Sequence, residues 1–349
     1  MIKILVADDS PTARALLVGI FRSDPTRLAV IGEATDGREA VEMTRQLRPD
    51  VVTMDIRMPT LDGYEATRRI MSEVPTPIVV VSSREVLEVE SSLEALTAGA
   101  LAVMEKPAGP AAADFDERSK QILAMVRAMA GVKLVKRHRE SVPTTVAAPP
   151  PSLDGRRNHV RAICMAASTG GPAAVQSIVS GLPRGFPIPI LIVQHIAKGF
   201  VSGLATLLDR ASRLRVKLAE PEEMLVGGTV YLAPDERHLG VDGVGRIVIS
   251  AARPIEGFRP SATFLFQSAA ETLGNAALGV ILTGMGSDGI AGLRHLKARG
   301  GRIIAQDEAS SVVFGMPGAA IEAGLADEVV RLADLPVRLL KACGERTTR

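Results

Sequence analysis

The chain of 349 residues is poor in cysteine and in aromatic side chains, with two cysteines, no tryptophan and 3% aromatic residues. Two cysteines, Cys164 and Cys343, cannot build a disulfide framework or a cysteine-rich zinc site. The scarcity of aromatics argues against base-stacking platforms for nucleic acids and predicts aliphatic cores. No apolar run approaches the ~20 residues that span a membrane, and no signal-like segment opens the chain. We therefore expect a cytoplasmic protein.

Charge of one sign is also lacking, because 41 lysines and arginines face 39 aspartates and glutamates, for a net charge of +2. This balance gives no support to nucleic-acid binding or to a membrane-surface role, and we expect neither partner. Hydrophobic residues make up 46% of the chain and charged residues 23%, which is typical of a globular protein. At ~150 residues per domain, the length predicts two domains.

Short aliphatic runs alternate with amphipathic segments of helical length over residues 1–131. Because the runs are apolar on both faces, they are typical of a parallel sheet covered on both sides. Five such strands alternating with helices predict a doubly wound α/β domain. The predicted strands are Ile2–Ala7, Leu28–Ile31, Val51–Met54, Ile78–Val81 and Leu101–Met104, and the clearest helices are Thr12–Arg22, Arg38–Leu47 and Asp114–Ala130.

Residues 132–158 are basic and rich in proline, which predicts a linker. The alternation resumes over residues 159–349, which predicts a second α/β domain built on a parallel sheet. Glycines between Tyr231–Ala233 and Ile247–Ile249 predict a β-hairpin, which would make the sheet mixed. The predicted strands are Val160–Ala166, Ile188–Val193, Thr229–Leu232, Arg246–Ser250, Ala277–Leu282 and Arg302–Ala305, and the predicted helices are Ala173–Ser180, Val201–Ala211, Ala262–Leu273 and Ile290–Ala298.

Chemically active side chains follow four strands of the first domain. Asp8 and Asp9 follow the first strand, Asp55 follows the third, Ser82 ends the fourth and Lys106 follows the fifth. These groups should converge, because the carboxyl ends of parallel strands share one edge of the sheet. Three clustered carboxylates repel one another without a cation, and hard oxygen ligands suit Mg²⁺. Lys106 and Ser82 would contact a phosphoryl group placed on Asp55, whereas helix capping explains only one of the carboxylates.

The whole first domain resembles response-regulator receiver domains, in the segments Leu5–Ser10, Met54–Pro59, Asp62-Gly63, Val81–Ser83 and Glu105–Pro107. The resemblance implies a flavodoxin-like fold in which Asp55 accepts phosphate from a histidine kinase. It also implies that Asp9, Asp55 and the backbone carbonyl of Arg57 ligate Mg²⁺, with Asp8 in support. Val103 stands where many receivers carry an aromatic switch residue.

A serine, a histidine and an aspartate follow strands of the second domain. Ser168 lies in a turn of small residues between a predicted strand and a helix, a geometry that can expose a nucleophile. From this segment alone, catalysis and plain turn chemistry are equally supported. His195 and Asp288 also follow predicted strands, and the three groups together suit a nucleophilic triad better than isolated structural roles. His238 could line the same cleft, whereas His295 is expected to be a surface or packing residue.

The second domain resembles the catalytic domain of chemotaxis response-regulator protein-glutamate methylesterases, the CheB family. The segments that carry the resemblance are Ala167–Pro172, Val193–His195, Tyr231–Pro234 with His238, Arg259–Ser261, Ile281–Gly289, Ala305–Glu308 and Phe314–Pro317. The resemblance implies that Ser168 attacks the γ-carboxyl methyl ester of a glutamate on a methyl-accepting chemotaxis receptor, while His195 accepts the proton and Asp288 orients the ring. It further implies that the backbone N–H of Met285, helped by Thr169, stabilises the oxyanion.

By the same resemblance, methanol leaves, water then releases free glutamate, and receptor glutamines can be deamidated by the same acyl chemistry. The esterase itself is expected to need no cofactor, and the chain is expected to be a monomer. The phosphodonor would be the histidine kinase of the chemosensory system.

A receiver joined to a hydrolase predicts regulation, in which the unphosphorylated receiver packs over the Ser168 cleft and phosphorylation of Asp55 releases it. The alternative is a phospho-dependent binding module of a non-flagellar chemosensory pathway, with weak or no esterase activity. The complete set of Ser168, His195 and Asp288 argues against that alternative. A generic lipase or protease is disfavoured because the sequence shows no aromatic or large apolar substrate pocket.

Overall fold

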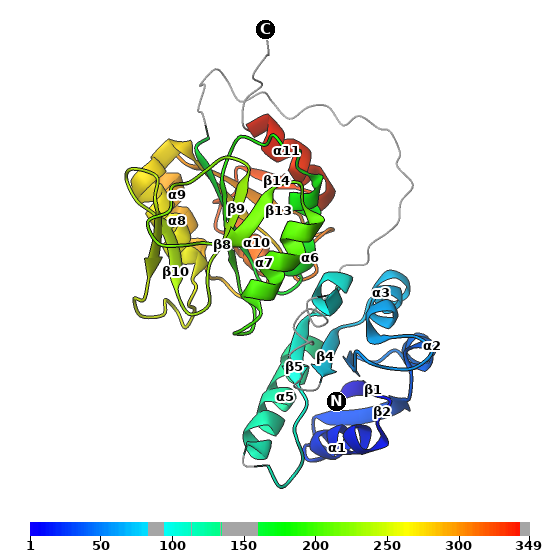
Figure 1. Cartoon of the computed structure of the whole chain (residues 1–349). Helices are drawn as coiled ribbons and strands as arrows, with labels where there is room; N and C mark the ends of the chain where they lie inside the picture. The colour runs from blue at the N-terminus through cyan, green and yellow to red at the C-terminus, as the bar shows by residue number, and fades with distance from the viewer. Residues whose placement is uncertain (83–93, 113, 133, 135–159, 343–349) are drawn as a thin grey trace, which may run out of the picture.

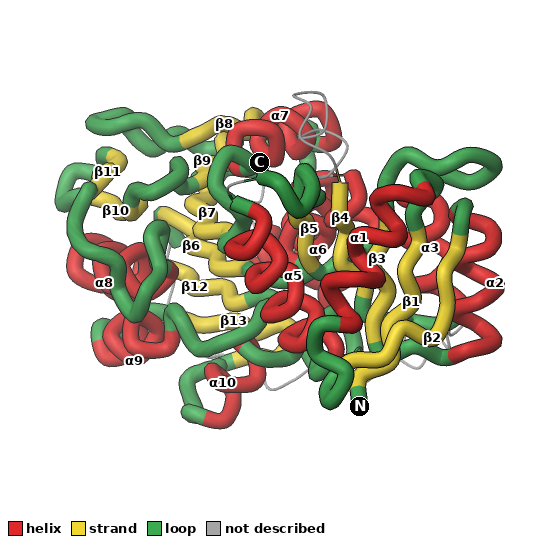
Figure 2. Tube along the Cα trace, turned by 90° about the horizontal axis from the view of Figure 1, so that it is seen from below, coloured by secondary structure: helices red, strands yellow, loops and turns green. Residues whose placement is uncertain are grey.

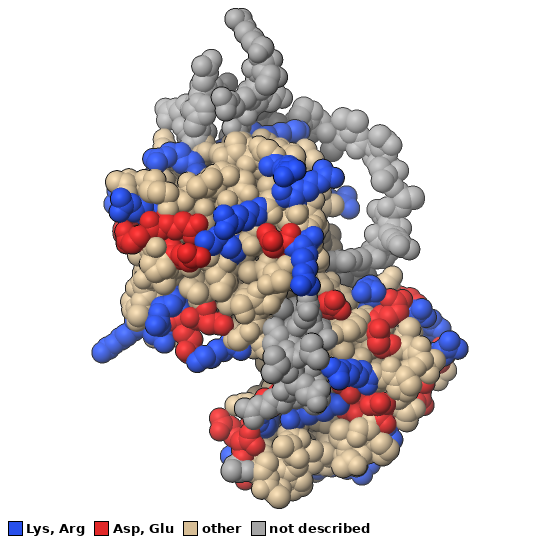
Figure 3. Space-filling model, viewed as in Figure 1, with Lys and Arg blue, Asp and Glu red and all other residues tan. Residues whose placement is uncertain are grey.

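The computed structural model describes residues 1–82, 94–112, 114–132, 134 and 160–342. These residues form two α/β units, which Figure 1 colours from blue to cyan and from green to red. Nearly all of the predicted linker lies outside the described residues, so the domain boundaries stay a prediction. Within the described part of the chain, no helix is long and apolar enough to cross a membrane. Basic and acidic side chains are interspersed over both units on the face shown in Figure 3.

The first unit is a five-stranded parallel sheet in the order β2-β1-β3-β4-β5. This order confirms the doubly wound fold predicted from the alternating pattern. The strands β1, β3 and β4 are buried almost throughout because helices cover both faces of the sheet. The elements are β1 Ile2–Ala7, α1 Pro11–Arg22, β2 Leu28–Ala34, α2 Gly37–Leu47, β3 Val51–Met54, α3 Gly63–Glu73, β4 Ile78–Ser82, β5 Ala102–Glu105 and α5 Phe115–Ala130. Residues 94–98, before β5, are also helical.

The second unit is built on a seven-stranded sheet in the order β14-β13-β12-β6-β7-β9-β8, with every neighbouring pair parallel. The first half of its elements are β6 Ala162–Ala167, α6 Gly171–Gly181, β7 Ile190–Gln194, α7 Val201–Ala211, β8 Arg215–Leu218, β9 Thr229–Leu232, β10 His238–Val241 and β11 Ile247–Ser250. The remainder are α8 Ala262–Leu273, β12 Ala277–Ile281, α9 Ile290–Ala298, β13 Arg302–Gln306, α10 Met316–Glu322, β14 Glu328–Val330 and α11 Leu335–Ala342, with short 3₁₀ turns at Gly274–Ala276 and Leu332–Asp334.

The prediction of a mixed sheet was wrong, and the hairpin has a different first strand. The antiparallel partner of β11 is β10, and the two form a separate two-stranded sheet. Tyr231, expected in the hairpin, pairs in parallel with Leu191 of β7 instead. The short strands β8, β10 and β14 were not predicted, because three or four residues carry too little alternation to distinguish a strand from a loop.

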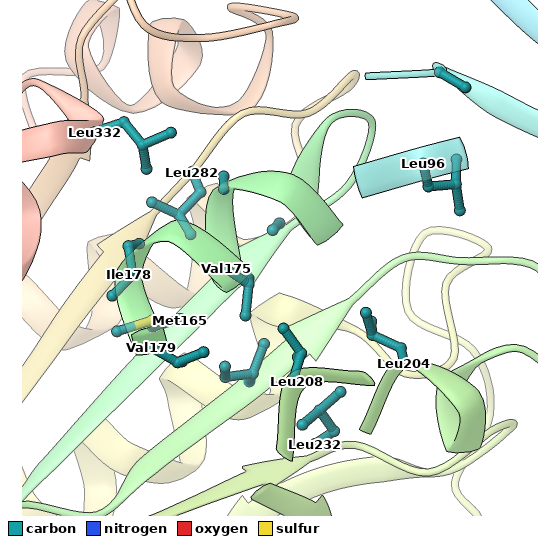
Figure 4. Packing of buried hydrophobic residues seen from close by; sticks show 14 of the residues in the cluster. Leu96, Met165, Val175, Ile178, Val179, Leu204, Leu208, Leu232, Leu282 and Leu332 are labelled. Atoms are coloured by element: carbon teal, nitrogen blue, oxygen red, sulfur yellow. The ribbon is translucent and has the colours of Figure 1, made fainter. Parts of the chain in front are cut away.

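Alternate side chains of β6 enter two separate cores. Met165 faces the core under α6 and α7, where it lies with Val175, Ile178 and Leu208 (Figure 4). Cys164 faces the opposite core, under α8 and α9. Burial raises the pKa of its thiol to about 12, so this cysteine is an unreactive core residue.

Apolar residues of the first unit pack against the second unit. Leu96, in the helical segment before β5, belongs to the same buried cluster as Val175 and Leu204 (Figure 4). Val312 and Val313 of the second unit belong to a cluster with residues of β1, β4 and α5. Figure 2 shows α5 lying between the two sheets. The face of the first unit formed by the 94–98 helix, β5 and α5 is therefore the one that meets the second unit.

Candidate active site and phosphorylation site

The register of β6 and β7 places Ser168 next to His195. Ala167 pairs with Gln194 in the parallel ladder, and each of the two residues that follow lies one step beyond its strand. The backbone N–H of His195 donates to the carbonyl oxygen of Ala167 at 2.9 Å. Since neighbouring strands lie ~4.8 Å apart, the serine and the histidine are neighbours at the edge of the sheet.

The turn after Ser168 is closed by a glycine in the left-handed region. Gly170 has a φ of +77°, and a Cβ at this position would lie 2.6 Å from Val312. Ser168 itself does not have a positive φ, so the left-handed residue of this turn is Gly170, two positions after the serine, and not the nucleophile as in the usual elbow. Helix α6 begins directly afterwards at Gly171, with Pro172 in its first turn. Its N-terminus therefore points positive partial charge toward the serine.

Asp288 lies beside His195, although seven strands and helices separate them in the chain. Oδ2 of the aspartate lies 3.0 Å from Nε2 of the histidine. Despite this short distance, Nε2 makes no aligned hydrogen bond. Nδ1, the other ring nitrogen, is buried and has no hydrogen-bond partner among the described residues. Nε2 is thus the nitrogen that faces the carboxylate, and Nδ1 is the one left to act as a base.

Hydrogen-bond donors surround the carboxylate of Asp288, whose side chain is 1% exposed. The Ser261 hydroxyl donates to Oδ1 at 2.8 Å, the Ala262 N–H donates to Oδ2 at 2.7 Å, and the Thr263 N–H donates to Oδ1 at 3.1 Å. Burial by itself raises the pKa of Asp288, but His195, the Ala262 N–H and the Ser261 hydroxyl outweigh it and hold the pKa below the ordinary value. The aspartate is therefore an anion fixed at the N-terminus of α8.

Two glutamines hold the loops of this site together, although the sequence predicted no role for either of them. Gln194 is buried, and its Nε2 donates to the carbonyl oxygens of Ser168 and His195 at 2.8 and 2.9 Å. Gln306, at the end of β13, accepts from the N–H of Thr283 through Oε1 at 2.8 Å. Their positions at the ends of buried strands were the available signal, but only the fold shows which carbonyl and amide each one meets.

The loop after β12 passes directly beside the serine. A Cβ added to Gly284 would lie 2.8 Å from the Cβ of Ser168, so only glycine allows this approach. The Thr283 hydroxyl lies 3.0 Å from the carbonyl oxygen of Thr169, and the backbone N–H of Ser168 donates to the carbonyl oxygen of Thr283. Met285 comes next and is 49% exposed. The two segments predicted to stabilise an oxyanion, around Thr169 and Met285, are thus adjacent.

Phe258 was missed by the sequence reasoning. Its ring stacks on the imidazole of His195, with centroids 4.4 Å apart and an interplanar angle of 14°. Phe258 sits in a tight turn, where its N–H and carbonyl both bond to Ile255. Its place beside the Arg259–Ser261 motif was the only signal in the sequence.

His238 does not line the cleft, contrary to the expectation. Its side chain is fully buried on β10 and stacks on Phe264 of α8. His295 lies on α9 with its side chain 39% exposed, as expected for a surface residue. Of the three histidines that the structure describes, only His195 lies at the serine.

A cavity of about 430 Å³ opens in front of Ser168 and His195. Phe200, Phe258 and Arg259 belong to the wall supplied by the second unit. The opposite wall comes from the first unit and is entirely apolar; its residues are Leu96, Leu101, Ala102, Val103 and Met125. The receiver-like unit thus closes one side of the serine cleft.

The predicted acidic cluster of the first unit is assembled at the carboxyl edge of its sheet. Asp8, Asp9 and Asp55 each place a carboxylate oxygen within 4.8 Å of the others. Lys106 reaches Asp55 Oδ2 at 2.6 Å and Asp8 Oδ2 at 2.9 Å. Ser82 ends β4 beside them and is buried, and its carbonyl oxygen accepts from the Lys106 N–H. Helix α1 is capped by the hydroxyl of Ser10, so capping does not account for the aspartates.

Burial and charge act in opposite directions on this cluster. Burial is the largest influence on Asp55 and raises its pKa, the hydrogen bond and charge of Lys106 lower it, and the charge of Asp8 raises it, so the pKa stays above the ordinary value. For Lys106, burial lowers the pKa, but bonds to Asp55 and Asp8 outweigh it and the pKa is raised. Asp8 Oδ2 is buried and lacks an aligned hydrogen-bond donor, although the lysine ammonium is close. Three carboxylate oxygens lie together, and one of them has no aligned hydrogen-bond donor. This arrangement fits a hard divalent cation such as Mg²⁺.

Family comparisons match both units. Residues 163–339 match the CheB methylesterase family, and residues 4–113 match the response regulator receiver domain. A protein-glutamate methylesterase/protein-glutamine glutaminase of Myxococcus xanthus is 56% identical over 342 residues, covering 98% of this chain and 97% of the relative. Another protein of that description, from Anaeromyxobacter dehalogenans, is 50% identical over 331 residues, covering 95% of this chain and 96% of the relative.

A solved structure agrees with the second unit. The CheB methylesterase catalytic domain of Thermotoga maritima is 40% identical, with a TM-score of 0.51, and the match covers 52% of this chain and 97% of that domain. With the sequence matches spanning nearly the whole chain, the protein belongs to the CheB methylesterase family and carries a response regulator receiver domain ahead of its esterase domain.

Proposed function

We propose that this chain is a phosphorylation-regulated protein-glutamate methylesterase and protein-glutamine deamidase that acts on methyl-accepting chemotaxis receptors. Ser168 Oγ attacks the γ-carbonyl carbon of a methylated glutamate, and His195 takes the hydroxyl proton through Nδ1. The histidine returns this proton to the leaving methoxide, which departs as methanol. Water then attacks the acyl-serine, His195 takes its proton and returns it to Ser168, and free glutamate is released. A glutamine follows the same path and releases ammonia.

Negative charge develops on the former carbonyl oxygen during both attacks. The backbone N–H of Met285, with help from Thr169, is the proposed oxyanion donor, an interaction worth ~3–4 kcal/mol of transition-state stabilisation. The N-terminus of α6, directly after the serine turn, adds favourable partial charge. Asp288 stabilises the imidazolium of His195 while the proton is held there.

The observation that carries this proposal is that the residues after three different strands lie together at one edge of the sheet. Ser168 follows β6, His195 follows β7, and Asp288 follows β12 with Oδ2 3.0 Å from the histidine. A hydroxyl, an imidazole and a carboxylate in this arrangement suit nucleophilic acyl transfer.

The receiver is proposed to control the esterase through Asp55, the phosphate acceptor from a chemosensory histidine kinase. Asp9, Asp55 and the backbone carbonyl of Arg57 would hold Mg²⁺, with Asp8 in support, and the cation would neutralise charge on the incoming phosphoryl group. Ser82 and Lys106 would contact that group by a hydrogen bond and by charge.

The apolar wall that the receiver contributes to the cavity supports an inhibitory role for the unphosphorylated state. Phosphorylation withdraws Lys106 from its bonds to Asp55 and Asp8, and Lys106 follows directly on β5, which carries Ala102 and Val103 of that wall. The phosphorylated receiver is proposed to leave the cleft, so that a receptor segment can reach Ser168. Val103 supplies no aromatic rotamer switch, so strand and helix shifts would carry the signal.

The decisive experiment measures methanol release from radiolabelled, methylated receptor membranes. Wild type should release methanol faster with a phosphodonor, Ser168→Ala should release none, and Asp55→Ala should lack the acceleration. Release that survives in Ser168→Ala would establish the alternative, a phospho-dependent binding module with an inert hydrolase fold. Faster hydrolysis of small acyl esters than of methylated receptor would indicate a generic esterase.

We propose further that the protein works in the cytoplasm as a monomer and that the esterase reaction uses no cofactor. The chemistry of Ser168, His195 and Asp288 is complete without a metal. Sedimentation of the purified chain and esterase activity in the presence of a chelator test the last two statements.

A further inference from the structure

His238 lies behind the active site, in a position that the esterase mechanism does not use. It begins β10 and is fully buried, with its ring stacked on Phe264 at a centroid distance of 4.8 Å and an angle of 18°. A buried histidine must satisfy both ring nitrogens or lose stability. Both nitrogens of His238 have partners, and those partners determine its chemical form.

The partners of His238 select one tautomer. The backbone N–H of Ser261 donates to Nδ1 at 3.2 Å, so Nδ1 carries a lone pair. Nε2 lies 3.1 Å from the carbonyl oxygen of Arg253, which can only accept, so Nε2 carries the proton. His238 is therefore neutral and bridges the loop before α8 at two points, with one acceptor and one donor.

Ser261, whose backbone N–H donates to Nδ1 of His238, also donates a hydrogen bond to the catalytic carboxylate of Asp288. Ser261 precedes α8, and its hydroxyl donates to Oδ1 of Asp288 at 2.8 Å. The next two residues donate their backbone N–H groups to the same carboxylate. A shift of Ser261 therefore displaces three of the donors that orient Asp288, whose Oδ2 faces His195.

We propose that His238 is a positioning residue of the esterase site, which as the Nε2–H tautomer fixes Ser261 and through it the orientation of Asp288 toward His195. This inference rests on the proposed function, because it gives the residue a role in that reaction. His238 touches no reacting atom, and its contribution is the direction of the Asp288 carboxylate. Two imidazoles thus serve the site, one as the base and one as a fixed support.

Two substitutions each keep one of the two hydrogen-bonding functions of the His238 ring, the acceptor at Nδ1 or the donor at Nε2. In His238→Asn, the amide oxygen takes the place of Nδ1, since both are two bonds from Cβ, and can accept from Ser261. In His238→Gln, the longer amide reaches the place of Nε2 and can donate to the Arg253 carbonyl, but leaves the Ser261 N–H without its acceptor. Both lose the stacked ring, so a role in packing alone predicts equal effects.

The experiment uses the full chain with a phosphodonor and measures kcat and KM for methanol release from methylated receptor membranes. We expect His238→Gln to lower kcat by about 10- to 100-fold with KM within twofold, because the Ser261 N–H loses its buried acceptor and the loop that orients Asp288 is no longer held in place. His238→Asn should stay within about threefold of wild type. His295→Asn, at a partly exposed position on α9, is the matched control and should equal wild type. Equal losses in the Asn and Gln variants, or a loss confined to KM, would overturn the proposal.

Ser261→Ala provides a second variant that leaves the His238 ring and its packing in place. It should lower kcat with KM unchanged, and His238→Gln should add little in an Asp288→Asn background, because both act through the same carboxylate. Fully additive effects would overturn the proposal. Ser168→Ala, assayed alongside, tests the proposed function separately, since that variant retains every bond of His238.

Discussion

Met125 offers a way to measure how much the receiver face contributes to closing the serine cleft. It lies on α5, is partly buried, and belongs to the apolar wall opposite Ser168. In Met125→Glu, the new carboxylate lies within this apolar contact while the cleft is closed. The carboxylate is exposed to water when the receiver leaves. Ala124, the preceding residue on α5, is exposed and does not line the cavity, so Ala124→Glu adds the same charge to the same helix as a control.

The expected effect follows from two contributions. Full burial of a methionine side chain is worth ~1.5–3 kcal/mol, so a partly buried one contributes about 1 kcal/mol to the closed state. A carboxylate in an apolar contact costs a further ~1–2 kcal/mol. Together they shift the closed-to-open equilibrium by about 2–3 kcal/mol, which is roughly a 30- to 150-fold change in that ratio. Basal activity rises by this factor until it reaches the activity of the fully open enzyme.

The assay is methanol release from methylated receptor membranes with no phosphodonor, followed by the same measurement with acetyl phosphate. Met125→Glu should have a raised basal rate and little further acceleration, whereas Ala124→Glu should behave as wild type. Phosphorylation of Asp55 in both variants shows that the receiver is folded. An unchanged basal rate in a phosphorylatable Met125→Glu would refute the inhibitory role of this contact.

Three further outcomes are expected. Phe258→Ala should lower kcat about fivefold in the receptor assay, because the ring stacked on His195 contributes ~1 kcal/mol to its placement, whereas Phe258→Tyr should stay near wild type. Gln194→Leu should lower the free energy of unfolding by ~1–3 kcal/mol in urea titrations, because two carbonyl oxygens lose their buried donor. The pKa of Asp288 is depressed in the folded protein, so its stabilising effect is present above the ordinary value of 3.8 and is lost as the pH falls through the lower folded pKa. In thermal melts, wild type should lose its advantage in melting temperature over Asp288→Asn as the pH falls below 3.8. A difference in melting temperature that is constant with pH would contradict this reasoning.

The sequence by itself was sufficient for the two sheets and for the residues at their carboxyl edges. Apolar runs such as Val51–Met54 and Ala277–Ile281 must be buried on both faces, which predicts parallel strands covered by helices. Since parallel strands end on one side of a sheet, a polar residue directly after such a run must lie at the shared edge. This local rule was enough to predict that Asp55 would meet Lys106, and that Ser168 would lie beside His195.

Only the tertiary structure decided what surrounds those residues. The roles of His238 and Phe258 depend on contacts between segments more than 20 residues apart, for which no periodicity in the chain gives a signal. The hairpin was predicted with the wrong first strand, because Thr229–Leu232 pairs with β7 and β8 of the larger sheet and β11 pairs with β10 instead. The apolar wall that faces the serine is a third case. Met125 and Val103 look like ordinary receiver residues in sequence, and their place at the esterase cleft follows from how two separately folded surfaces pack.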